Sequence, residues 1–373
     1  NIAYTRNGSL GTLYLDGVEL GTHTVIYSLS SSDYWSIGQE FDGTSVTNEY
    51  VGHIDNVSVW DRALSEQEIQ NNAAGTLSGN EDGLRGYWIF NNGSDTIAYD
   101  HSGNANHGNI LGATWSMYGC TDPYAGNYDS TATMDDGSCA GYPDNGGYSL
   151  QFDGTDDYVQ TGLYLNNLPY TIKCTFKADA NSGEQSIVDT DIAGSYGNSI
   201  ILGYGNGDNT IDVQYHNGSY NSPFQYQADT WYDVVATFEE GMVKLYVDGL
   251  YVGSKTYSQS NPDGSAVRFG RHNAGDSQWF GGNIDNVAIW GTALDSLEIN
   301  SLFNSNNNID LLSDFDNYSS ANFLEGYWKF NTGMDTVLYD HSGNANHGDI
   351  IGASWNVSLT HVPDDNFEQT LID

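Results

Sequence analysis

Basic residues are scarce in this sequence. The chain has 10 Lys and Arg against 49 Asp and Glu, which gives a formal net charge of −39 at pH 7. A surface of this sign repels nucleic acid and anionic membranes and favours divalent cations. No apolar run approaches the ~18 residues that a membrane-spanning helix needs. We therefore expect no nucleic-acid partner and no membrane insertion.

Proline is also rare, and no signal peptide is visible at the start of the chain. The sequence has 6 Pro but 44 Gly, which favours many turns between short strands. It has 9 Trp, 13 Phe and 27 Tyr, enough to build cores, so the high charge does not indicate disorder. Asn1 opens directly into strand-like sequence. We expect that a start was removed or left out, and that the chain is a piece of a longer secreted protein.

The three cysteines divide into a pair and a single residue. Cys120 and Cys139 flank a short polar loop, CTDPYAGNYDSTATMDDGSC, and we predict that they form a disulfide, which favours an exported protein. Cys174 lies in TIKCTFKA, where Ile172, Cys174 and Phe176 share one face of a strand. This alternation predicts that Cys174 is a buried free thiol.

Two copies of one domain follow each other along the chain. The matching segments keep their order, and only the lengths of the loops between them change. They are LYLDG at 13–17 with LYVDG at 245–249, GHIDNVSVW at 52–60 with GNIDNVAIW at 282–290, and GYWIFNNGSDTIAYDHSGNANHGNILGATW at 86–115 with GYWKFNTGMDTVLYDHSGNANHGDIIGASW at 326–355.

The second copy is complete and the first is not. The second opens at GYSLQFDGTDDYVQTG (147–162), whereas the first begins at the equivalent of about residue 233, so its opening strands are absent from this chain. We predict four segments: a first domain at 1–117 without its opening strands, an acidic linker loop at 118–142, a complete domain at 143–357, and the start of a following segment at 358–373.

Another register is possible. Residues 86–115 would then begin the second domain, the Cys120–Cys139 loop would be an insertion within it, and residues 326–355 would begin a third domain. The sequence after 355 ends in VPDDNFEQTLID and contains no further FDGTDDYV, which favours the linker interpretation.

The pattern within each copy is that of β-structure. In 230–257, Val243, Leu245 and Val247 alternate with polar residues, and Glu240-Gly241 and Asp248-Gly249 are turn signals. One helix is expected after each IDNV strand, because SEQE at 65–68 is a capping box and DSLE at 295–298 is its weaker counterpart. Many antiparallel strands with one apolar face predict two packed sheets.

Five motifs in order carry a family resemblance. FDGTDDYV, WYDVVATF, LYVDG, GNIDNVAIW and GYWKFN…DHSGNANHG…GASW together resemble the bacterial laminin-G-like domain over nearly all of 1–117 and 143–357. That resemblance implies an all-β, concanavalin A-like jelly-roll sandwich in each copy, with one short helix. The Cys120–Cys139 linker and the VPDDNFEQTLID tail resemble segments of large secreted surface proteins of Bacteroidota-type bacteria.

The string DHSGNANHG occurs twice, at 100–108 and at 340–348. It is typical of a turn, because Gly and Asn accept unusual backbone angles. It is also typical of a calcium loop, since Ca²⁺ takes oxygen ligands from carboxylates and amides. The candidate ligands in the two copies are Asp100, Asn104, Asn106, Asp340, Asn344 and Asn346.

Calcium ligands are expected elsewhere as well. The family resemblance implicates the FDG strand and the G-x-I-D strand, that is Asp153, Asp157 and Asp285 in the second copy and Asp55 in the first. The disulfide loop is either a further calcium site or a plain solvated linker. Its candidate ligands are Asp122, Asn127, Asp129, Asp135 and Asp136.

Zinc is disfavoured at the repeated string. Its histidines have no accompanying Cys, and an acidic, oxygen-rich setting favours a hard cation. The expected role of His101, His107, His341 and His347 is packing or hydrogen bonding.

Two segments offer aromatic and polar side chains for a sugar. In NAGDSQWFGG (273–282) the candidates are Asp276, Gln278 and Trp279. In IDVQYHNGSYNSPFQY (211–226) they are Tyr215, Tyr220 and Tyr226. The alternative is that these aromatics are core or ordinary strand surface. Phe280 is expected in the core, because Tyr50 occupies the matching place in the first copy.

These patterns favour a non-catalytic, calcium-stabilised adhesion or carbohydrate-binding module, secreted and associated with a cell surface. Its partner would be a glycan or a cell-surface ligand. The alternative is a structural subunit of an extracellular fibre or surface assembly, which self-associates and whose first domain is completed by strand addition from a neighbouring chain. An enzyme is disfavoured, because no strand carries the closely spaced carboxylates of the glucanases that share this sandwich.

Overall fold

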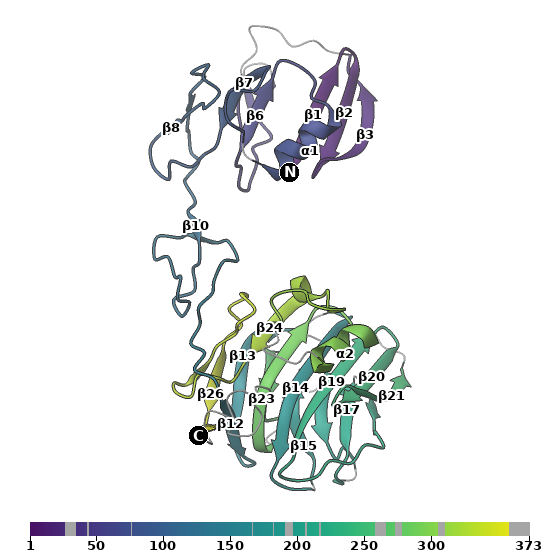
Figure 1. Cartoon of the computed structure of the whole chain (residues 1–373). Coiled ribbons are helices and arrows are strands. Elements are labelled where there is room, and N and C mark those ends of the chain that lie inside the picture. Colours follow the sequence, from purple (N-terminus) through teal and green to yellow (C-terminus); the bar gives the residue numbers. More distant parts are fainter. Residues whose placement is uncertain are drawn as a thin grey trace, which may run out of the picture. The chain divides into compact units, whose positions relative to one another are not determined.

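The computed structural model describes residues 1–26, 35–42, 45–75, 77–165, 167–181, 183–190, 197–205, 207–215, 218–257, 266–272, 278–304 and 310–357. The chain forms two compact units, Asn1–Met117 and Tyr118–Asp373 (Figure 1). No helix among the described residues is long and apolar enough to span a membrane.

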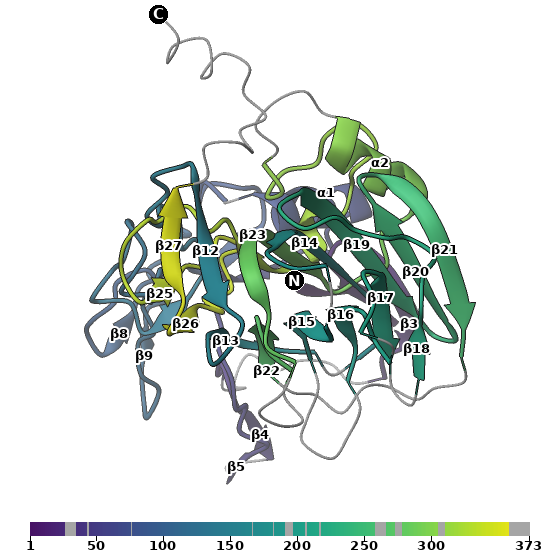
Figure 2. The ribbon, with the colours of Figure 1, turned by 90° about the horizontal axis from the view of Figure 1, so that it is seen from below.

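The second unit is a sandwich of two antiparallel sheets (Figure 2). The first sheet has the order β21-β20-β19-β14-β23-β12-β27, with β24 paired beside β23. Its strands are β12 (Tyr148–Asp153), β14 (Tyr170–Ala178), β19 (Trp231–Glu239), β20 (Met242–Val247), β21 (Leu250–Thr256), β23 (Gly281–Trp290), β24 (Leu324–Trp328) and β27 (Ser354–Val357).

The second sheet has the order β18-β17-β16-β15-β22-β13-β26-β25. Its strands are β13 (Tyr158–Tyr164), β15 (Gln185–Asp189), β16 (Ser199–Leu202), β17 (Ile211–Tyr215), β18 (Gly218–Tyr220), β22 (Ala266–Phe269), β25 (Val337–Leu338) and β26 (Gly348–Ile351). The two-layer, all-β architecture expected from the sequence is confirmed.

Side chains from the inner faces of both sheets form one core. Ile172, Cys174 and Phe176 of β14 are fully buried in it, as the alternation in this strand predicts. Phe280 also lies in this core, as expected. Cys174 is confirmed as a free buried thiol, and burial raises its pKa to about 12. Cys174 is therefore a packing residue.

A second, smaller core lies on the outer face of the first sheet. There α2 (Ser296–Asn304) packs Ile299 and Leu302 against residues that include Trp290 of β23. The segment after α2 contains the short 3-10 helix η1 (Ala321–Phe323) and supplies Tyr318, whose hydroxyl accepts a hydrogen bond from Trp290 Nε1 at 2.7 Å. The helix and this segment thus cover part of the outer face of the first sheet.

Both predicted helices are present, and each begins at its predicted cap. The first unit has α1 (Glu66–Ala74), with Ser65 as N-cap and Glu68 completing the capping box. In the second unit the Asp295 carboxylate accepts hydrogen bonds from the backbone of Leu297 and Glu298. These bonds satisfy amides at the start of the helix that have no partner within it.

The first unit contains the same closing elements as the second, but in separate small sheets. These are β1 (Ile2–Asn7), β2 (Leu10–Leu15) and β3 (Val18–Thr24); β4 (Glu40–Asp42) with β5 (Ser45–Thr47); β6 (Val57–Trp60) with β7 (Leu84–Trp88); and β8 (Ile97–Ala98) with β9 (Gly108–Asn109). In the second unit β14 joins β19 to β23, whereas no strand among the described residues of the first unit joins β1 to β6.

The inner sheet face of the first unit is uncovered. Leu13 is 40% exposed, whereas its counterpart Leu245 is 0% exposed. Ile54 is 37% exposed, whereas its counterpart Ile284 is 0% exposed. These side chains are apolar because the fold places a second sheet over them, and the described first unit contains no such sheet.

The disulfide between Cys120 and Cys139 is confirmed. Its loop contains β10 (Tyr118–Gly119), which pairs in parallel with β11 (Met134–Asp135). The loop is part of the second compact unit. Cys120, Cys139 and Tyr142 form a small core with Tyr339, which explains why the loop is not merely solvated.

Candidate functional site

A row of polar side chains crosses the outer face of the second sheet. Val267 and Phe269 of β22 point into the core, so Arg268 between them points outward. The cross-strand partners of Arg268 are Gln160 on β13 and Asp189 on β15, and the same register continues to both sides. The row across seven strands reads Asp349, Gln160, Arg268, Asp189, Ser199, Gln214 and Ser219.

Hydrogen bonds within the row leave several atoms unpaired. Arg268 Nε donates to Gln160 Oε1, and Ser199 Oγ donates to Asp189. Arg268 Nη1 and Gln214 Oε1 are buried without a hydrogen-bond partner in the described part of the chain. Ser186 Oγ on the same face is also buried without a hydrogen-bond partner among the described residues. A buried polar atom without a partner costs ~1–3 kcal/mol, so the described residues leave this part of the row unsatisfied.

An aromatic pair lies beside one end of the row. Tyr158 on β13 and Trp279 are tilted rings with centroids 6.2 Å apart. The Arg271 guanidinium lies over both, 4.7 Å from each centroid, and holds the rings by cation–π contact. Burial and the nearby charge of Arg271 lower the pKa of Arg268. Arg268 and Arg271, two of the 10 basic residues of the chain, therefore lie close together.

The predicted sugar-binding residues have different outcomes. Trp279 is half-buried at this aromatic pair, and Gln278 next to it donates to Glu184. Tyr215 and Tyr226 are instead core residues, so the expectation that they contact a ligand is wrong. Tyr215 shares a strand face with the buried Ile211 and Val213. Tyr220 is partly buried against the same core. Asp276 lies outside the described residues.

The FDGTDD turn brings three carboxylates together. Oxygens of Asp153, Asp156 and Asp157 lie within 4.8 Å of one another, close enough to share a cation. Burial, together with the charges of Asp153 and Asp156, raises the pKa of Asp157. Asp157 Oδ2 also accepts the backbone N–H of Asp153 at 2.8 Å, which fixes the turn. Asp156 was missed in the sequence, although it stands between two residues chosen there.

The other two calcium ligands expected from the family resemblance, Asp285 and Asp55, do not join this turn. Asp285 is buried on β23 and accepts the Asn286 backbone N–H at 2.8 Å. Asp55 is exposed and accepts from both the backbone and the side chain of Asn56. Neither forms a close group of three metal-binding side chains in the described residues.

The repeated string is a turn built around a buried carboxylate. Asp340 Oδ1 accepts the backbone N–H groups of Tyr327 and Ser342, and Oδ2 accepts that of Asn346. Asp100 in the first copy accepts the equivalent N–H groups of Tyr87, Ser102 and Asn106. Burial raises the pKa of Asp340, while at Asp100 the N–H donors outweigh burial and lower the pKa.

The asparagines of the string serve the same turn. Asn344 and Asn346 donate to backbone carbonyls of Leu324 and Glu325, and Asn104 and Asn106 donate to the equivalent carbonyls of the first copy. N–H donors directed at a carboxylate occupy the lone pairs that a cation would use. These hydrogen bonds are those of the turn alternative, and a cation at these six residues stays a prediction.

The acids of the disulfide loop are also turn formers and do not cluster. Asp129, Asp135 and Asp136 each accept the N–H of the residue two positions on. Asn127 bridges the loop through Ser138 and Ala140. The expected second calcium site is not assembled by these described side chains.

Asp122 docks the disulfide loop onto the second unit. Its Oδ2 accepts hydrogen bonds from the Tyr142 hydroxyl at 2.7 Å and from His347 Nε2 at 2.6 Å. His347 Nδ1 accepts the Asp340 N–H at 2.9 Å, so the ring proton is on Nε2 and is donated to Asp122. Burial opposes ionisation, but these hydrogen bonds outweigh it and lower the pKa of Asp122.

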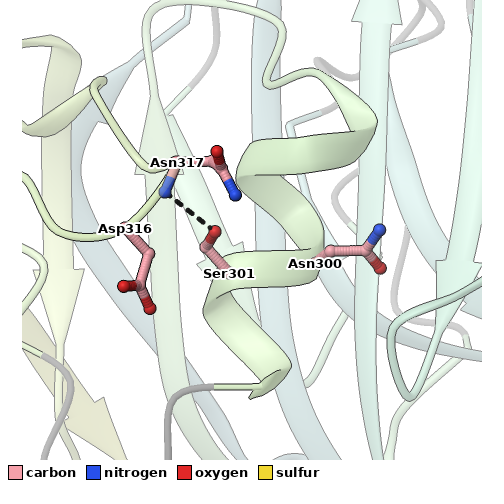
Figure 3. Close-up of a pocket in the computed structure, with 4 residues that line it drawn as sticks. All are labelled: Asn300, Ser301, Asp316 and Asn317. Atoms are coloured by element: carbon pink, nitrogen blue, oxygen red, sulfur yellow. Dashed lines mark hydrogen bonds between the residues drawn. The ribbon is translucent and has the colours of Figure 1, made fainter.

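A pocket of about 400 Å³ beside α2 is polar and open. Figure 3 shows its lining residues, Asn300, Ser301, Asp316 and Asn317, with the Asn317 backbone N–H donating to Ser301 Oγ at 3.2 Å. One carboxylate among amides and a hydroxyl forms no catalytic arrangement, so we do not assign a function to this pocket.

Residues 1–70 and 153–300 match the family Laminin_G_3, described as the concanavalin A-like lectin/glucanases superfamily. The chain belongs to this superfamily. The match covers more than half of the sequence and includes most of the second-sheet strands that carry the polar row. A comparison with curated proteins finds no match.

Several solved structures are similar to this chain at a distance. One, titled a "putative carbohydrate binding protein" from Bacteroides ovatus, is 16% identical with a TM-score of 0.45, and the match covers 63% of this chain and 70% of the other. A pentraxin from Limulus polyphemus is 17% identical, with a TM-score of 0.35 and coverages of 43% and 83%. Domain 4 of an arabinanase from Geobacillus stearothermophilus is 17% identical, with a TM-score of 0.34 and coverages of 41% and 75%.

The polar row itself was missed in the sequence. Its signal is alternation: SIIL, IDVQY and AVRF each place a polar residue on the face opposite the core residues. The alternation assigns each residue to a face. It does not show that the polar positions of seven strands share one register.

His341 makes the second unit of this superfamily member sensitive to acid. Burial, and then the charge of Lys329, lower the pKa of His341 to about 4 from an ordinary 6.5. The unfolded state therefore binds the proton first, and stability present above pH 6.5 is lost as the pH falls toward 4. Relative to a His341→Gln variant, we expect the wild type to lose roughly 2 kcal/mol of unfolding free energy between pH 7 and pH 5.

Urea unfolding at both pH values measures this difference. His101→Gln changes the exposed counterpart in the first copy and is the matched control. An equal loss in the wild type and in His341→Gln would contradict the assignment.

Proposed function

We propose that the second unit is a non-catalytic carbohydrate-binding module that uses the outer face of its second sheet. The observation that carries this proposal is the cross-strand polar row, with Arg268 Nη1 and Gln214 Oε1 buried and unpaired among the described residues. Sugar hydroxyls donate and accept hydrogen bonds, so they complement such a row. Trp279 and Tyr158 at its end supply the aromatic surface that sugar rings pack against.

Two features of the chain, its disulfide and its net charge, support a role outside the cell. The Cys120–Cys139 disulfide is of the kind that persists in oxidising surroundings. The net charge of −39 suits solubility and divalent cations and opposes nucleic-acid binding. We infer a secreted, cell-surface-associated protein of the Bacteroidota type, in which this module contributes adhesion to glycans.

Trp279→Ala tests the binding surface. We expect a glycan retained by the wild-type chain on an array to bind about tenfold more weakly to this variant, because one aromatic contact contributes ~1.5 kcal/mol. Isothermal titration with the retained glycan measures the change. Trp35→Ala removes a tryptophan of the first unit that is 69% exposed, and it is the matched control.

Three outcomes would count against the proposal. They are the absence of any retained glycan, equal binding by Trp279→Ala and the wild type, and release of new reducing ends from the bound glycan. The last would show catalysis.

We also propose that calcium binds the Asp153, Asp156 and Asp157 turn. The repulsion among these three carboxylates, which helps to raise the pKa of Asp157, is relieved by a cation, and oxygen ligands suit Ca²⁺. The cation would hold the turn between β12 and β13, which connects the two sheets of the sandwich. No step of sugar binding is assigned to it.

Thermal unfolding in chelator and in calcium tests this site. Calcium at 100 times its Kd adds about 2.7 kcal/mol to the stability of the folded state, so the midpoint rises by several degrees. Asp156→Asn removes one carboxylate of the group and should abolish most of this rise. Asp136→Asn changes an exposed acid of the disulfide loop and should keep it. An equal rise in both variants would place calcium elsewhere.

A second candidate function is extracellular assembly by strand addition. The observation that favours it is the uncovered inner face of the first unit, where Leu13 is 40% and Leu15 is 43% exposed. Strands like those of residues 147–232, supplied by a neighbouring chain, would cover this face and pair with its sheet edges.

Sedimentation velocity over a range of concentrations tests the assembly. Burial of one leucine contributes ~1.5–3 kcal/mol, so Leu13→Lys should weaken self-association at least about tenfold. Leu312→Lys changes a leucine of the second unit that is 47% exposed, and it should have little effect. A chain that stays monomeric at high concentration would contradict strand addition.

A further inference from the structure

The second copy of DHSGNANHG is a receptor for the disulfide loop. His347 donates to the Asp122 carboxylate, and the rings of Tyr124 and Tyr142 stand edge-on to the imidazole at 5.4 and 5.1 Å. Tyr339 completes the receptor, since it packs on Tyr142 and joins the core that contains the disulfide. One carboxylate and two aromatic rings of the loop therefore meet one imidazole and one aromatic ring of the string region.

The first copy holds the same receptor in the same geometry. The Asp100 backbone N–H donates to His107 Nδ1 at 3.0 Å, compared with 2.9 Å between Asp340 and His347. The indole of Trp88 donates to the Asn106 carbonyl at 3.0 Å, the distance found between Trp328 and Asn346. Because Nδ1 accepts, the proton of His107 is also on Nε2.

The two receptors differ in what covers them. Tyr99 is 37% exposed, whereas its counterpart Tyr339 is 7% exposed. His107 is exposed, and no residue in the described ranges accepts a hydrogen bond from its Nε2, whereas Nε2 of His347 is bonded to Asp122. Tyr99 stands edge-on to His107 at 5.4 Å, much as Tyr339 stands to His347 at 5.7 Å. The first receptor is preformed and uncovered.

We propose that the surface formed by Tyr99, His101 and His107 binds a second disulfide-closed acidic loop of the 118–142 type. The occupied copy shows which chemistry fits: an Asp carboxylate that accepts from imidazole Nε2, flanked by two tyrosines. The occupant is a loop of this type and not an unrelated acidic peptide, because the equivalent receptor of the second unit holds such a loop. The string is thus a docking element that joins a stapled loop to each sandwich.

The loop at 118–142 does not fill this role for the first copy, because it is already docked on the second unit. A tethered segment meets its own receptor at an effective concentration of about millimolar, which favours that receptor over a free one. A loop peptide added in solution should therefore bind the first receptor, because the tethered loop already occupies the second.

Titration of the full chain with an oxidised synthetic peptide of residues 118–145 tests the proposal. Calorimetry should show one site per chain. Tyr99→Ala and His107→Ala should each weaken binding at least about tenfold, because each removes a buried ring contact or a charge-assisted hydrogen bond. His23→Ala changes another exposed histidine of the first unit and should bind as the wild type does. An Asp122→Asn peptide should bind weakly.

A second experiment tests the proposal if the isolated peptide does not fold. A further copy of residues 118–145 is joined to Asn1 through a flexible Gly/Ser linker, and the modification of His107 by diethyl pyrocarbonate is followed. We expect it to slow at least about tenfold relative to the chain without the added loop.

Failure in both arms would overturn the proposal, as would peptide binding that His107→Ala leaves unchanged. Self-association of the unmodified chain that is lost in His107→Ala would also overturn it, because the occupant would then be a second copy. The assembly proposed above depends on Leu13 and not on His107, so the two results are distinguishable.

Discussion

The pairing of β14 on both of its edges is the constraint on which the second unit depends. This strand bonds to β19 through residues 170–177 and to β23 through residues 171–178, so it joins the two halves of the first sheet. Its inner side chains, Ile172, Cys174 and Phe176, then bury themselves against the second sheet. No strand among the described residues of the first unit takes this place. Its described strands form the same hairpins, but these stay in separate small sheets with apolar side chains exposed.

The same alternation that builds the core also builds the candidate binding face. Each second-sheet strand that contributes apolar residues to the core presents its other residues on the outside. Register places those residues in one row. Core and site are therefore two faces of one sheet, and the rigidity of the core holds the hydrogen-bonding groups in fixed positions. Part of the outer face of the first sheet is covered by α2 and the segment after it.

Much of the fold could be predicted because its signals are local or repeated. The two copies, the capping box at Ser65 and the buried Cys174 each follow from short patterns that need no tertiary information. The same alternation that placed Cys174 correctly assigns Tyr215 to the core face of its strand, so that error was avoidable. The register that aligns Arg268 with Asp189 and Gln160 was not readable, because it joins strands far apart in the sequence.

The repeated string DHSGNANHG shows a second limit of prediction from the sequence. Asp, Asn and Gly suit a calcium loop and a hydrogen-bonded turn equally well, and the choice depends on where backbone N–H groups point. Three such groups converge on Asp340, one of them from β24, and this convergence exists only in the folded chain. Nor could the sequence show that Asp122 meets His347, more than two hundred residues away.

Hydrogen exchange of the full chain with and without a bound glycan tests the central claim most directly. We predict that the glycan slows exchange in β13, β16, β17 and β22, with little change in the disulfide loop or in 337–347. Protection confined to that loop and its receptor, with the second-sheet strands unchanged, would contradict the assignment of the polar row as the binding surface.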